Sequence, residues 1–149
     1  MKTRGWLALM VGAFLVTAGT AQDDTIKKER AKLKGSWKLV QMEAGGEKAP
    51  EDAIKSMGME FADDKVFLKD AKQKKEGTYK IDPSKKPTTI DITPADGPDK
   101  GKPLPGIYMI DGDTLKLCAA DEPGQDRPTE FATKKGVHAV LMTFKREKP

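Results

Sequence analysis

The sequence contains one cysteine and one histidine among its 149 residues, and aromatic side chains make up only 6% of it. A single cysteine excludes an internal disulfide, so the fold must be stabilised by its apolar core. Cys118 lies at the end of the apolar run Leu115–Cys118, and we interpret it as a strand residue that acts as a small hydrophobe.

Neither sign of charge dominates the sequence. It has 27 basic and 23 acidic residues, a net charge of +4, and both signs are interspersed along the chain. This pattern is typical of a solvated surface and lacks the basic stripe that follows a phosphate backbone. Nucleic acid is therefore not an expected partner.

Long apolar runs are absent except at the N-terminus, where three features predict a signal peptide over residues 1–21. Lys2 and Arg4 form a basic start, Gly5 to Val16 is apolar, and Gly19–Ala21 fits a small-residue cleavage site. The apolar run is shorter than the roughly 20 residues that span a bilayer. We expect an exported chain, periplasmic or secreted, that does not span the membrane after cleavage. An uncleaved N-terminal anchor remains the alternative.

The predicted mature part, residues 22–149, forms one domain whose net charge falls to +2, because the removed segment holds Lys2, Arg4 and no acid. Residues 24–34 are predicted to form a short helix that Asp23 or Asp24 caps and Gly35 ends. A helical turn is predicted at residues 50–56, where proline occupies the first turn.

The rest of the domain shows short runs of period two between turn residues. Asp111-Gly112 is the strongest hairpin turn, and the loops at residues 94–106 and 120–136 are the longest. The predicted strands are residues 36–42, 57–61, 65–69, 76–82, 88–93, 107–110, 114–119 and 137–146. Eight antiparallel strands with mostly short links predict an all-β, up-and-down barrel, which leaves no open sheet edge.

Gly35-Ser36-Trp37, at the start of the first strand, resembles the lipocalin G-x-W signature. The resemblance implies a lipocalin-like (calycin-type) barrel in which Trp37 closes the floor and a basic residue of the last strand packs over it. Arg146 occupies that place, with Lys145 as second choice. An arginine over an indole is a cation–π contact.

A wider resemblance covers residues 33–147 and rests on LKGSWKLVQME, EGTYKIDPSKKPTTIDIT, GPDKGK, GIYMIDGDTLKLC, DRPTEF and LMTFKRE. These stretches are similar to a family of small exported bacterial proteins, lipocalin-like and known mainly from planctomycetes, which has no established function. The resemblance implies the fold and the exported setting, and no activity.

Alternation along the strands predicts which side chains point into the barrel. An eight-stranded barrel either fills with its own side chains or holds one small ligand, and the bulky inward set favours a mostly filled core. The tentative ligand-binding residues of this interior are Trp37, Leu39, Phe61, Leu68, Tyr79, Ile92, Tyr108, Leu117 and Met142.

No pattern in the sequence predicts catalysis, a metal site or a cofactor. There is no G-x-S-x-G elbow, and no glycine-rich phosphate loop follows a strand. His138 is interpreted as a surface residue at a strand end, and the aspartates at 96–99 and 111–113 as turn residues, because calcium-loop spacing is missing. The chain is not expected to be an enzyme.

Arg127 stands between Asp126 and Glu130 in the second long loop. We interpret this as a local ion-pair clasp that orders the loop, with a polar lip that contacts a partner as the alternative.

Two hypotheses about function follow. The first is a non-enzymatic extracytoplasmic protein that binds a small apolar or amphipathic ligand in the barrel. The alternative is a structural or protein-interaction module of the cell envelope, with a filled barrel, a protein partner and working loops.

Overall fold

A computed structural model describes residues 12–148 of the chain, with side chains for 22–148. Of the predicted signal peptide, residues 1–21, the first eleven lie outside the described residues. For residues 12–21 only the backbone is described. Within residues 12–148, no helix is both long enough and apolar enough to cross a membrane.

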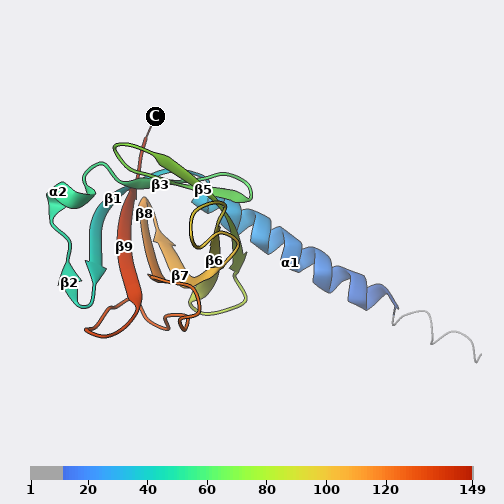
Figure 1. Cartoon of the computed structure of the whole chain (residues 1–149). Coiled ribbons are helices and arrows are strands. Elements are labelled where there is room, and N and C mark those ends of the chain that lie inside the picture. Colours follow the sequence, from blue (N-terminus) through green and yellow to red (C-terminus); the bar gives the residue numbers. More distant parts are fainter. Residues whose placement is uncertain (1–11, 149) are drawn as a thin grey trace, which may run out of the picture.

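The described chain folds into a closed antiparallel barrel of eight strands, as predicted (Figure 1). The barrel closes because β1 pairs with both β3 and β9, and the short strand β2 adds only two rungs to β1. The strands are β1 (Gly35–Ala44), β2 (Glu47–Lys48), β3 (Gly58–Phe61), β4 (Lys65–Lys69), β5 (Lys74–Asp82), β6 (Thr88–Pro94), β7 (Leu104–Asp111), β8 (Thr114–Ala120) and β9 (Ala139–Arg146).

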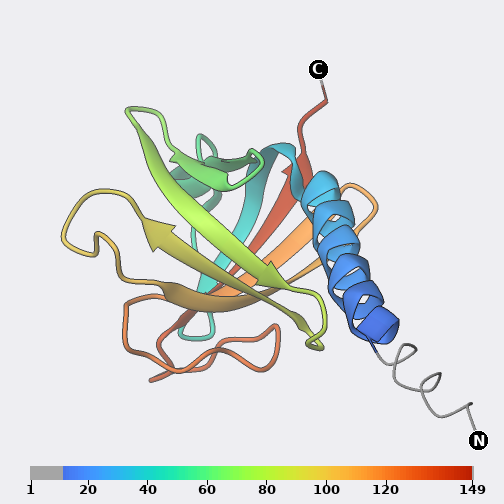
Figure 2. The same cartoon turned by 90° about the vertical axis from the view of Figure 1, so that its right-hand side faces the viewer.

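Two helices accompany the barrel, α1 (Gly12–Leu33) and α2 (Glu51–Ile54). The prediction that Asp23 or Asp24 begins the first helix is wrong, because α1 runs continuously from Gly12. Its last turns lie against one end of the barrel, and its first turns extend beyond it (Figures 1 and 2). Leu33 is completely buried in the barrel core, and Ile54 of α2 is buried in the same core.

A β-bulge in β1 changes which side chains point inward. Leu39 pairs with Phe144 and Gln41 pairs with Thr143, so Val40 is left as the extra residue. Trp37 and Leu39 point inward before the bulge, whereas Met42 packs against the core after it and Gln41 is exposed. Strict alternation, which places Gln41 beside Leu39, fails at this point because one residue has no partner.

Strand β7 begins at Leu104, three residues before its predicted start, despite the proline at 105. Gly106 belongs to this extension and explains it. A Cβ there would lie 2.9 Å from the carbonyl oxygen of Cys118 and 3.0 Å from the Cβ of Ala119. The glycine therefore lets β7 and β8 approach closely, which sequence periodicity does not reveal.

The long loop at residues 121–138 packs against the outside of the barrel. Phe131 from the loop and Leu141 of β9 contact the buried residues Ile107, Cys118 and Ala139. Strand β8 is consequently buried on both faces, with Leu117 inside the barrel and Cys118 beneath the loop. The loop is thus part of the fold.

Candidate functional site

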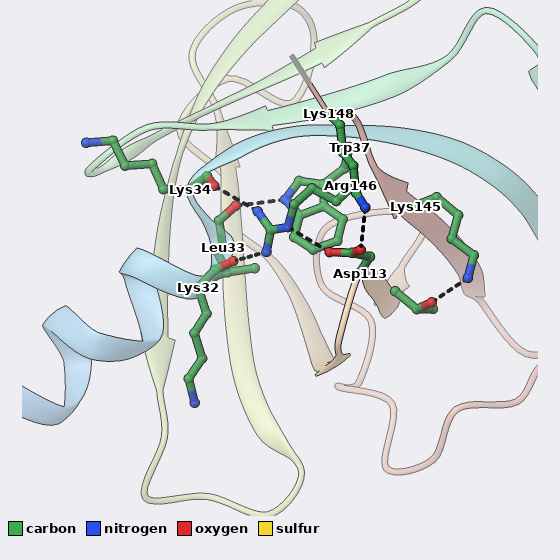
Figure 3. Close-up of polar contacts among 9 residues, drawn as sticks. Lys32, Leu33, Lys34, Trp37, Asp113, Lys145, Arg146 and Lys148 are labelled. Atoms are coloured by element: carbon green, nitrogen blue, oxygen red, sulfur yellow. Dashed lines mark hydrogen bonds and ion pairs between the residues drawn. The ribbon is translucent and has the colours of Figure 1, made fainter.

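The structure brings together Trp37 and Arg146, the two residues that the sequence analysis pairs at the barrel floor. The Arg146 guanidinium carbon lies 4.1 Å from the centroid of the Trp37 ring (Figure 3). Its Nε lies 3.6 Å from Asp113 Oδ1. Lys145, the second choice, instead donates from Nζ to Thr114 Oγ1 at 2.8 Å.

The same pair satisfies the last carbonyl groups of α1, which have no partner inside the helix. Trp37 Nε1 donates to the Leu33 oxygen at 2.7 Å, and Arg146 donates to the Lys32 and Lys34 oxygens at 2.7 and 3.2 Å. A cation at this position also complements the negative end of the helix dipole. Gly35 adopts φ +122°, a value that other residues rarely take, where the chain turns from α1 into β1. The G-x-W motif and Arg146 therefore fix the helix to the barrel.

The proposed ligand-binding residues mostly form the packed core. Six of them are buried: Trp37, Leu39, Phe61, Tyr79, Tyr108 and Leu117. Ile92 and Met142 are partly buried against the same core. Leu68 is wrong as an interior residue, because 41% of it is exposed. It pairs with Lys75 near the tip of the β4–β5 hairpin, where residues 74–76 of β5 are all exposed.

Polar groups from α1 meet two tyrosines at the end of the barrel. Tyr108 donates its hydroxyl to Glu29 Oε2 at 3.1 Å, and the Arg30 guanidinium lies 5.6 Å from the Tyr79 ring centroid. Burial, and then the Glu29 charge, raise the pKa of Tyr108 far above its usual range. Burial also raises the pKa of Tyr79. Both phenols are therefore neutral at physiological pH.

Among the surface cavities formed by the described residues are three that Phe61, Tyr79 and Phe144 of the core do not line. One of about 330 Å³ lies under residues 125–139. A second of about 250 Å³ lies beside Trp37 and residues 55–58. The third and largest, about 440 Å³, lies between α1, β7 and the long loop.

We call this third cavity the α1–β7 groove, lined by Glu29, Lys32, Lys86, Pro87, Thr88, Tyr108, Met109, Ile110 and Phe131. Its apolar part includes Pro87, Phe131 and Met109, which is 44% exposed. Lys86 contributes positive charge, and Lys32 forms an ion pair with Glu29 at 3.0 Å. This groove was not predicted from the sequence, because its walls come from four separate segments. The one sequence feature that indicates it is Met109, an apolar residue that strand alternation places on the outer face, between inward-pointing Tyr108 and Ile110.

Arg127 does not form the predicted clasp with Asp126 and Glu130. Its Nη2 donates to Asp91 Oδ1 at 2.7 Å, and its Nη1 donates to the carbonyl oxygens of Gly106 and Ile90 at 2.9 and 3.2 Å. Glu130 instead lies 4.0 Å from Lys134. Arg127 orders the loop as expected, but by joining it to β6 and β7.

Cys118 and His138, the single cysteine and the single histidine of the sequence, have different surroundings. Cys118 is buried beneath the loop, and burial raises the pKa of its thiol, so it is a poor nucleophile. His138 is exposed just before β9, and its Nδ1 lies 3.6 Å from carboxylate oxygens of both Asp121 and Glu122. Sequence reasoning did not connect these three residues, since the long loop separates them.

Comparisons with protein-family models, with curated proteins and with solved structures found no match to this chain.

Proposed function

We propose that this protein is a non-enzymatic protein-interaction module of the cell envelope, in which a filled barrel serves as the rigid scaffold. The observation that carries the proposal is the packed interior. Trp37, Phe61, Tyr79, Leu115, Leu117 and Phe144 are each at most 2% exposed. These side chains occupy the space that a carrier of the same strand number would leave for a ligand.

The α1–β7 groove is the proposed contact surface. It combines exposed Met109 and partly buried Pro87 and Phe131 with two lysines, a combination that suits an amphipathic segment carrying acidic groups. All of its lining residues follow Ala21 and belong to the predicted mature chain. Export of the chain is supported by the N-terminal sequence pattern.

The non-enzymatic part of the proposal is supported by the surroundings of Cys118 and His138. Within the described residues, the ion-pair partners of His138 are the carboxylates of Asp121 and Glu122, and the Cys118 thiol lies 3.9 Å from the Ala132 oxygen. Neither arrangement is the nucleophile–base pair that acyl transfer requires.

The proposal is tested by placing a photo-crosslinking amino acid at Met109 in cells that export the protein. Val40, an equally exposed apolar position on β1, is the matched control. We expect a discrete adduct from position 109 that is absent from position 40 and is weakened by Lys32→Glu with Lys86→Glu. Equal labelling at both positions, or an adduct insensitive to the charge reversals, would contradict the proposed contact surface.

A further inference from the structure

Three side chains with metal-ligating atoms meet at the neck of the long loop. Asp121 and Glu122 follow β8, and His138 precedes β9. His138 Nδ1 lies 3.6 Å from Asp121 Oδ1 and 3.6 Å from Glu122 Oε1, and one ligand atom from each residue lies within 4.8 Å of the others. A single ion could contact all three.

The barrel itself fixes this arrangement. The β8–β9 ladder ends at Ala120 opposite Ala139, so Asp121 and His138 are the next pair across the two strands. The Asp121 amide donates to the His138 carbonyl oxygen at 3.3 Å, which continues the ladder by one rung. Two of the three side chains are therefore positioned by the sheet and not by the loop.

The carboxylate of Glu122 is oriented by a separate contact. Gln125 Nε2 donates to Glu122 Oε1 at 2.8 Å. Hydrogen bonds of this kind, outside the ligands themselves, commonly hold metal-binding carboxylates in place.

The spacing fits a tetrahedral ion. Zinc lies about 2.0–2.1 Å from imidazole nitrogen and carboxylate oxygen, so neighbouring ligand atoms are roughly 3.3 Å apart. The two 3.6 Å separations from His138 need only a small closure to reach that value, and the Asp121 and Glu122 atoms lie within 4.8 Å of each other. The His138 contacts are ion-pair contacts that are too long for hydrogen bonds.

From this geometry we propose that Asp121, Glu122 and His138 form a binding site for a divalent transition metal ion of the zinc type. One imidazole and two carboxylates form a mixed nitrogen and oxygen set that suits zinc, whereas calcium prefers oxygen ligands alone. The ion neutralises two negative charges that otherwise face each other. All three side chains are exposed, so water completes the coordination.

A bound ion would hold the two ends of the long loop together. A bound ion joins the residue after β8 to the residue before β9, and the loop between them carries Arg127 and Phe131. Phe131 lines the α1–β7 groove, so the metal stiffens one of its walls. The metal site itself does not require that the groove binds a partner.

The test is calorimetric titration of the purified, chelator-treated chain with zinc chloride. The experiment uses untagged protein, because a histidine tag would itself bind zinc and His138 is the only histidine of the chain. We expect saturable binding of one equivalent. His138→Ala should abolish it, and Asp121→Asn and Glu122→Gln should each weaken the affinity at least about tenfold.

Glu130→Gln is the matched control, since Glu130 is an exposed carboxylate of the same loop that lies outside the cluster. It should bind zinc as the wild-type chain does, and circular dichroism should show all variants folded. Absence of saturable binding to the wild-type chain would overturn the proposal. Undiminished binding to His138→Ala would do so too, because the carboxylates would then act as scattered surface ligands.

Discussion

At the scale of single residues, Arg146 links three parts of the structure. Its guanidinium covers the Trp37 indole, donates to two carbonyl oxygens at the end of α1, and faces Asp113 at the β7–β8 turn. The stacking partner was predictable from the G-x-W resemblance. The carbonyl acceptors were not, because these depend on how α1 meets the barrel.

Arg146→Ala should lower the free energy of unfolding by about 0.5–2 kcal/mol, the range of a cation–π contact. Denaturant titration followed by circular dichroism measures the change. Lys145→Ala is the matched control, since the neighbouring lysine makes one exposed contact with Thr114, and it should change stability by less. If the two variants are equally stable, the stacking contact contributes nothing to the fold.

Tyr108 should make the fold sensitive to alkaline pH. Because its pKa is raised in the folded state, the phenol keeps its proton there while the unfolded chain releases it above about pH 10. The stabilisation is fully present below pH 10 and is lost as pH rises beyond it.

Tyr108→Phe removes this ionisation from both states, so its free energy of unfolding should fall less between pH 8 and pH 11 than that of the wild-type chain. Urea titrations at the two pH values give the comparison. Tyr79 continues to contribute, so a smaller decline is expected and not its complete loss. An equal decline in both proteins would show that Tyr108 ionises freely in the folded state.

At the scale of elements, the sequence predicted the strands well and the loops poorly. Period-two runs placed all eight barrel strands, because apolar alternation and turn residues directly determine them. The bulge at Val40 and the early start of β7 at Leu104 escaped, since both depend on pairing with a distant strand. Arg127 escaped for the same reason, because its partner Asp91 is remote in sequence.

Arg127→Ala should loosen the long loop without unfolding the barrel. Hydrogen bonds from a charged group contribute about 1.5–3 kcal/mol, so amide exchange in residues 121–138 should accelerate roughly 10- to 100-fold. Hydrogen–deuterium exchange with mass spectrometry measures this, and strand β5 serves as an internal reference. Lys134→Ala, which removes an exposed pair at 4.0 Å, should leave loop exchange unchanged. Unchanged exchange in Arg127→Ala would mean that other contacts hold the loop, such as Phe131 packing and the Thr133 hydrogen bonds with Gly46 and Glu43.

At the scale of the whole molecule, the interior of the barrel is occupied by the protein's own side chains. Leu33 of α1 and Ile54 of α2 join the strand residues in one core. The closed architecture was predictable from the sequence, because eight strands with mostly short links have few other ways to hide their edges. The bulky inward residues favoured a mostly filled core, but the contributions of the two helices and the β1 bulge were not predictable, since they depend on how side chains are placed in three dimensions.

The surface features were equally hidden from the sequence. The α1–β7 groove and the Asp121–Glu122–His138 cluster each combine residues from segments that only the closed barrel brings together. The proposed function therefore rests on surface sites that tertiary structure creates, and it requires that the interior takes no ligand.

Native mass spectrometry of the protein, purified gently after export, tests that claim most directly. A filled barrel predicts the bare mass of the polypeptide, the same under native and denaturing conditions apart from bound metal ions. A retained adduct with the mass of a lipid or metabolite, lost on denaturation, would contradict the account and identify the barrel as a carrier.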